Sequence, residues 1–273
     1  MNTGVNIRPV PGRGILLLVT GLLFFCRLPG YASSEPLPFS VGEQIEYSVS
    51  WEMIPAGSAV FKVLDHGMMD GKKIRRFVLE ARSKKFLDLF YKIRDRIESH
   101  TDHEFSRSVF YSKIQSGKEK KQVRVRFDWE KKQAVYSNFG GKRDPIDIPD
   151  HTFDPLSSFY KLRTLDLSDW EDPEKDPPGQ QDLFFPVTDG KKCFIQKGAV
   201  LKKETISTPS GARYDTYLIA PQVTHFSGVF KKSTDAAVRV WVSADHLQIP
   251  VKIKIKVAVG SIIFDLVSVT SPG

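Results

Sequence analysis

Cysteine is scarce in this chain of 273 residues, which contains only Cys26 and Cys193. We expect Cys26 to be removed with an N-terminal targeting segment, so the mature protein keeps one cysteine and forms no internal disulfide. This number excludes a small scaffold held by several disulfides and zinc sites built from paired cysteines. Because apolar Phe194 and Ile195 follow Cys193, we expect its side chain to behave as a small buried hydrophobe.

Recognisable catalytic and cofactor motifs are also missing. The chain contains no Gly-x-Ser-x-Gly nucleophile elbow and no His-Glu-x-x-His metal motif. Gly140-Gly141-Lys142-Arg143 lacks the spacing of a phosphate-binding loop and indicates a turn. We therefore predict a protein that is not an enzyme, and we expect no catalytic residue, no bound metal and no cofactor.

The six histidines give one local cluster, His100 and His103 with two acidic neighbours. In an extended segment this spacing places the two rings on opposite faces, so we favour a solvated polar turn over a metal site. An envelope hydrolase that cleaves a glycan or an ester remains the alternative. It requires His100, His103 or His151 to meet a carboxylate or Ser157 in a cleft.

Long apolar runs are absent except for Ile15–Cys26. That run is shorter than the roughly 20 residues that a membrane-spanning helix needs. It follows a sparse basic start and precedes Gly30-Tyr31-Ala32, whose small residues fit a cut before Ser33. We predict that residues 1–32 are a cleavable signal peptide and that no transmembrane anchor remains after cleavage; an uncleaved anchor is the alternative.

Alternation of apolar and polar residues dominates the remaining sequence and is clearest at 45–51, 123–129 and 251–257. Strands with one apolar face are typical of antiparallel sheets with one dry face. Two segments have helical spacing instead: 84–94, and 154–165, which begins with an Asp-Pro pair suited to a helix start. We predict a mainly β fold, with a single strongly curved antiparallel sheet (an open or half barrel) packed around one or two short helices.

A loop rich in proline and acid, at residues 168–181, interrupts the strand pattern. We expect residues 33–273 to form a single β-rich domain that contains this loop, because one core buries more surface than two halves would. Four charged residues stand in apolar segments and are candidates for a buried ion pair with a structural role: Glu80, Arg82, Arg163 and Asp265.

Two strands carry basic residues at every second position: Lys252, Lys254 and Lys256 on one, and Arg124 and Arg126 on the other. If the two strands lay together, these side chains would form a positive stripe for anionic lipid headgroups, acidic glycans or phosphates. The simpler interpretation is that such charges keep an exposed sheet face soluble and protect an edge from aggregation.

Phenylalanine is abundant, with 19 residues. Phe127 and Phe159 are among those that could line a concave sheet face and hold an acyl chain, or could fill a dry core around the helix at 154–165. We expect a lipid or anionic glycan ligand, and an envelope protein as a further candidate partner. Nucleic acid is not expected, because the aromatic residues do not lie between the charged ones as stacking platforms require.

Four blocks, in order along residues 39–269, resemble exported bacterial proteins of the family called domain of unknown function 3108. They are Phe39–Trp51 followed by Ala56-Gly57, Asp154–Arg163, Thr208–Gly211, and Trp241–Asp245 followed by Pro250-Val251. The resemblance implies a β-rich envelope protein of Gram-negative type, and it provides no catalytic residues. A fainter similarity, at the level of the fold alone, relates the chain to open-barrel lipoprotein carriers of the periplasm.

Together these features predict a periplasmic, non-catalytic protein of the cell envelope. We expect a binding, carrier or assembly factor for a lipid or an amphiphilic glycan. Besides the hydrolase, a pure protein-interaction scaffold is the alternative. A concave face filled completely by side chains would exclude the carrier.

Overall fold

Fifteen β-strands and two helices make up the described part of the computed structural model, which covers residues 36–117, 120–167, 184–222, 237–257 and 259–271. The predicted signal peptide and the predicted loop at 168–181 lie outside these residues. Residues Leu37–Gly273 form one compact unit. No helix of the described segments is long and apolar enough to cross a bilayer.

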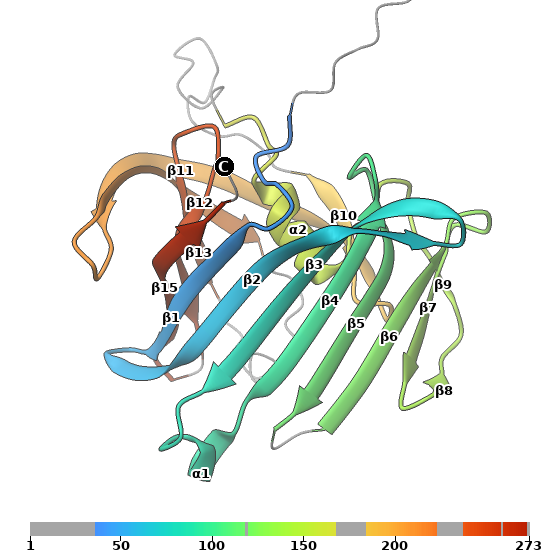
Figure 1. The fold of residues 1–273 in the computed structure, drawn as a ribbon, viewed down its shortest axis with the longest axis horizontal. Helices are drawn as coiled ribbons and strands as arrows, with labels where there is room; N and C mark the ends of the chain where they lie inside the picture. Colours follow the sequence, from blue (N-terminus) through green and yellow to red (C-terminus); the bar gives the residue numbers. More distant parts are fainter. Residues whose placement is uncertain (1–35, 118–119, 168–183, 223–236, 258, 272–273) are drawn as a thin grey trace, which may run out of the picture. The chain divides into compact units, whose positions relative to one another are not determined.

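The strands form one antiparallel sheet that is not closed, as predicted, in the order β10-β11-β12-β13-β14-β15-β1-β2-β3-β4-β5-β6-β7-β8, with β9 paired to β7 (Figure 1). Their bounds are β1 Gln44–Trp51, β2 Ile54–Met69, β3 Lys72–Ser83, β4 Arg94–Asp102, β5 Ser108–Ser116, β6 Lys120–Asp128, β7 Gln133–Asn138, β8 Gly141–Lys142, β9 Ile146–Asp147, β10 Phe185–Thr188, β11 Cys193–Ser207, β12 Arg213–Gln222, β13 Val238–Ser243, β14 Pro250–Lys256 and β15 Ser261–Thr270. Neighbours in the sheet follow each other along the chain, except where β15 pairs with β1 and where β9 pairs with β7.

The predicted alternation sets the faces of these strands. In β6, Val123, Val125 and Phe127 are buried, whereas Arg124 and Arg126 are exposed. The apolar sides of β1 to β7 share one core with helix α2 (Pro155–Leu162), and β11 to β13 contribute a second, smaller core. The sheet therefore has one dry face, and α2 lies against it (Figure 1).

The two predicted helices differ in outcome. Helix α2 begins where the sequence indicates, because the side chain of Asp154 accepts hydrogen bonds from the backbone of Leu156 and Ser157; it ends at Leu162, before the predicted end at residue 165. The helix predicted over 84–94 shrinks to α1, Asp88–Tyr91. Helices shorter than about 12 residues are marginal without packing, and here the pairing of β3 with β4 takes the chain back into the sheet at Arg94.

Candidate functional site

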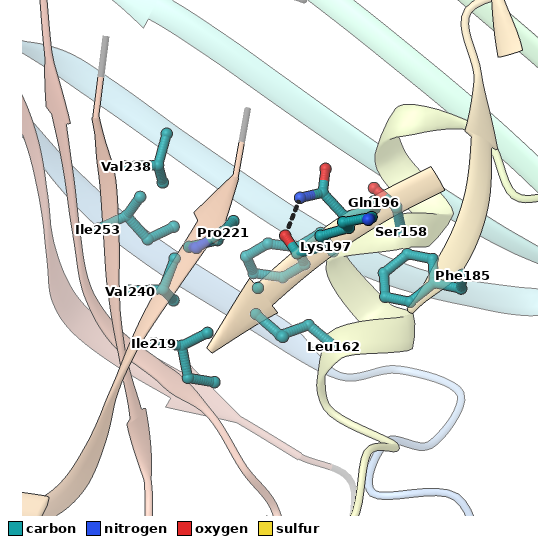
Figure 2. A pocket seen from close by; sticks show the side chains of 12 residues that line it. Ser158, Leu162, Phe185, Gln196, Lys197, Ile219, Pro221, Val238, Val240 and Ile253 are labelled. Carbon is teal, nitrogen blue, oxygen red and sulfur yellow. Dashed lines mark hydrogen bonds between the residues drawn. The ribbon is translucent and has the colours of Figure 1, made fainter. Parts of the chain in front are cut away.

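An apolar cleft of about 200 Å³ lies between helix α2 and strands β10 to β14 (Figure 2). Leu162 of α2 and Ile219, Val240 and Ile253 of the strands point into the same space (Figure 2). The described lining residues are Ser158, Phe159, Leu162, Phe185, Gln196, Lys197, Gly198, Ile219, Pro221, Val238, Val240 and Ile253. The described side chains thus pack the concave face over β1 to β7 but do not fully fill it beside β11 to β13.

The chemistry of this lining is almost entirely that of hydrocarbon. Of its polar side chains, Gln196 already donates from its amide to the carbonyls of Lys197 and Gln222, at 2.8 and 3.2 Å. Within the described lining, Lys197 is the one titratable residue, and its ammonium lies 5.4 Å from the centre of the Phe184 ring. The cleft can therefore hold an apolar group by burial, beside a single cation, and it offers no paired acid and base.

The volume limits what the cleft can accept. Sites for drug-sized ligands have volumes of about 300–1,000 Å³, so this cleft is too small to enclose a whole lipid. A dry apolar cavity of about 150 Å³ takes up benzene, which suggests that about 200 Å³ accommodates roughly six to eight carbons. One arm of an amphiphile fits, with the remainder outside.

Buried hydrogen bonds fix the first turn of α2, which forms one wall of the cleft. One carboxylate oxygen of Asp154 accepts hydrogen bonds from the hydroxyls of Ser99 on β4, Ser108 on β5 and Ser157 of the helix, at 2.5, 2.6 and 2.8 Å. Asp154 is fully buried, and this desolvation raises the pKa of its carboxyl although the three hydroxyls oppose the shift. The network attaches the helix to two central strands.

A buried ion pair fixes the other end of α2. The guanidinium of Arg163 donates to both carboxylate oxygens of Glu43, at 2.7 and 3.0 Å, and to the carbonyls of Pro38 and Leu247, at 2.6 and 3.1 Å. Both charged side chains are buried, with 0% and 2% of their surface exposed. The helix is therefore held at both ends, and the cleft wall is preformed.

This pair corrects one sequence interpretation. Arg163 does pair inside the protein, but its partner is Glu43, which was not among the four candidates. Two of the other candidates form ion pairs at partly exposed positions: Glu80 with Lys62 and Arg96, and Asp265 with Lys252. Arg163 and Glu43 are 120 residues apart, and no local pattern links them.

The two predicted aromatic ligand residues lie in different places. Phe159 lines the cleft and stacks on Phe61 with ring centres 4.2 Å apart. Phe127 is buried in the packed core and stacks on Trp129 at 6.0 Å. Cys193 is half-buried against that core, and burial raises the pKa of its thiol.

The two basic strands are not neighbours, so their charges do not form one stripe along a strand pair. Six strands separate β14 from β6 in the sheet order. Arg124 and Arg126 are exposed on β6, Lys252 pairs with Asp265 at 3.3 Å, and Lys254 and Lys256 are exposed at the end of β14. Alternation indicates which face a side chain occupies but not which strand lies beside it.

The residues required for a hydrolase do not line the cleft. His100 contacts Glu98 through Nε2 at 2.9 Å, the ring of His103 packs against that of His66, and His151 contacts a backbone carbonyl. Ser157 meets a carboxylate, but in the buried network at the start of α2. Across the described segments, no group of three or more potential ligands could hold a metal.

Sequence reasoning missed most of the cleft. Its aliphatic residues on β12, β13 and β14 belong to strands with ordinary alternation, and nothing local marks them as uncovered. Phe159 was found because it lies on the predicted helix face. The signal for the rest is the shortness of α2, which covers only part of the dry face.

Comparison with known proteins gives a family and a fold. The family described as "Protein of unknown function (DUF3108)" matches residues 46–267, which confirms the resemblance. No curated protein matches the chain. A solved β-barrel-like protein of domain of unknown function DUF1849 from Brucella abortus is similar in fold, with a TM-score of 0.51 and 9% identity, over 86% of this chain and 99% of that one.

Two further solved structures are more distant. A candidate exported protein with a YmcC-like fold from Bacteroides fragilis gives a TM-score of 0.38 and 12% identity, over 86% of this chain and 98% of that one. A candidate lipoprotein from Parabacteroides distasonis gives 0.33 and 11%, over the same shares. At such identities the similarity concerns the fold alone.

Proposed function

The chain belongs to the DUF3108 family of proteins of unknown function, and we propose that it is an exported, non-catalytic binding protein of the cell envelope. Its ligand is an amphiphile, a lipid or a glycolipid, whose apolar arm enters the cleft between α2 and β11 to β14. The mature protein acts in the periplasm after removal of residues 1–32. The cleft is the observation that carries this proposal.

Burial of hydrocarbon supplies the affinity in this account. Each methylene removed from water contributes about 0.8 kcal/mol, which is close to a fourfold gain in affinity. The lining offers many aliphatic contacts and few competing hydrogen bonds. Because both ends of α2 are held by buried polar contacts, little conformational ordering is required on binding, and this preserves affinity.

Lys197 gives the cleft a preferred orientation for an amphiphile. It lines the cleft and is the only cation among the described lining residues, so an anionic or polar headgroup is favoured near it over a cationic one. The headgroup itself stays outside, since the cleft accepts roughly six to eight carbons on the scale of known dry cavities. Burial of the apolar arm therefore contributes most of the affinity, and the charge of Lys197 contributes less.

A chain-length series tests this function. The mature protein is titrated with straight-chain alkanoates of about six to twelve carbons by calorimetry. Affinity should rise about fourfold with each methylene until about eight carbons and then level off. A dependence that is flat, or that rises without a limit, would contradict binding in a cleft of this size.

A pair of matched variants locates the binding. Leu162→Trp fills the cleft from the helix side and should abolish alkanoate binding. Leu201→Trp makes the same exchange at an exposed position of β11, with 47% of the residue accessible, and should bind like the wild type. Equal binding by the two variants, with unchanged melting temperatures, would refute the assignment of the cleft.

A further inference from the structure

One end of the sheet gathers three chain connections. In an antiparallel sheet the β1–β2, β3–β4 and β14–β15 connections fall at the same end of the strands, and hydrogen bonds join them. The indole nitrogen of Trp51 donates to the carbonyl of Val259 at 2.9 Å, and the backbone nitrogen of Lys84 donates to the carbonyl of Ala56 at 2.8 Å. The β1–β2 hairpin thus contacts both neighbouring connections, and Figure 1 shows the hairpin and α1 at the same end of the sheet.

These connections expose large apolar side chains to solvent. Met53 is 94% exposed, Leu89 86% and Val259 70%, and the others are Trp51, Ile54 and Phe86. Single exposed apolar residues are ordinary, but a group of them at one place marks an interaction surface. We call this group, from residues 51–54, 86–89 and 259, the apolar edge.

Lysines surround the apolar edge. Lys84, Lys85 and Lys92 flank α1, and Lys254 and Lys256 lie at the adjoining end of β14; all five are exposed. The acidic residues of the same connections are Glu52 and Asp88, and Asp88 is already paired with Arg94 at 2.7 Å. The edge is therefore both apolar and positively charged.

We propose that the apolar edge docks on an anionic lipid bilayer, with the apolar side chains at the headgroup boundary and the lysines against lipid phosphates. Apolar side chains with surrounding lysines are the composition of interfacial membrane binding, and tryptophan favours that depth. A protein partner fits less well, because lysine is depleted in protein–protein interfaces.

Part of the cleft lining lies toward the same end of the sheet as the apolar edge. Lys197, Pro221 and Val238 lie at the ends of β11, β12 and β13 that point the same way as the β1–β2 hairpin. Docking would bring a lipid surface close to these lining residues. The docking proposal itself rests on the apolar edge alone and stands whether or not the cleft binds a ligand.

Sedimentation with vesicles tests the docking. Mature protein is mixed with vesicles of phosphatidylcholine alone or containing phosphatidylglycerol. It should bind the anionic vesicles, with each lysine contributing about a fivefold gain near the surface. Raising salt from about 0.1 M to 1 M shortens the screening length from about 10 to 3 Å and should weaken binding. Absence of binding to anionic vesicles would overturn the proposal.

Variants place the contact on the molecule. The double exchange Met53→Glu with Leu89→Glu should lower vesicle affinity at least tenfold, since both side chains are exposed and must enter the interface. Met68→Glu is the control, because Met68 is 68% exposed at the opposite end of β2, and it should bind like the wild type. Undiminished binding by the double variant, or an equal loss in the control, would overturn the proposal.

A last variant separates this proposal from the proposed function. Leu162→Trp, which fills the cleft, should bind anionic vesicles like the wild type. If Leu162→Trp lost vesicle binding at an unchanged melting temperature, docking through the apolar edge would be overturned and vesicle binding would be assigned to the cleft.

Discussion

Replacing Glu43 by glutamine should destabilise the protein strongly, because it leaves the guanidinium of Arg163 charged and buried. The exchange keeps the size of the side chain and one acceptor oxygen. It removes the negative charge of the carboxylate to which Arg163 donates two hydrogen bonds, at 2.7 and 3.0 Å. Breaking a buried pair from one side costs about 3–5 kcal/mol. In a domain of this size 1 kcal/mol shifts the melting temperature by about 2–4 °C, so we expect a fall of about 6–20 °C.

Thermal unfolding followed by circular dichroism measures this fall. A double-mutant cycle with Arg163→Met isolates the pair, and the double variant should lose less stability than the two single variants together. The exposed pair of Lys132 and Asp150, at 2.6 Å with more than half of each side chain exposed, provides the control, and Asp150→Asn should leave the melting temperature unchanged. A fall of less than about 2 °C for Glu43→Gln, or strictly additive losses, would refute the account of how α2 is held.

Two further predictions concern the same face of the sheet. Burial raises the pKa of Asp154, so the folded state binds the proton of this carboxyl more tightly than the unfolded state does. The stability of the wild type relative to Asp154→Asn should therefore fall as the pH rises from about 4 to 7. A difference in unfolding free energy that stays constant over this range would contradict the prediction. Gly190 has φ of +82°, and a methyl group added there would lie 2.7 Å from a methyl group of Val125. Gly211 has a similar φ of +87° but open space around it. Gly190→Ala should therefore lower the melting temperature more than Gly211→Ala does. Equal losses in the two alanine variants would show that packing beside β6 has no effect.

Local features of the sequence were sufficient to predict the mainly β fold, several of the strands and the start of the main helix. Alternation specifies which side chains of a strand are dry, as in β6, and Asp154-Pro155 specifies where α2 begins because it supplies both the cap and a donor-free first residue. The helix predicted over 84–94 was mostly wrong for a nonlocal reason: Arg94 and its successors pair with β3, and this pairing outweighs weak helical spacing.

Features that depend on contacts between distant segments could not be predicted. The pairing of β15 with β1 fixes the sheet order, and only that order shows that Lys254 and Arg124 lie far apart in the sheet. The partner of Arg163 is equally nonlocal. Of the cleft, Phe159 alone was anticipated, since the uncovered region depends on where a short helix stops over the sheet.

The central claim, that the cleft holds an amphiphile, is tested most directly by native mass spectrometry of mature protein purified from the periplasm, followed by organic extraction. The account predicts an added mass, released by the solvent, that corresponds to a lipid or glycolipid and is absent from the Leu162→Trp variant. A protein that carries no added mass in detergent-free buffer, or the same added mass in the wild type and in Leu162→Trp, would contradict it.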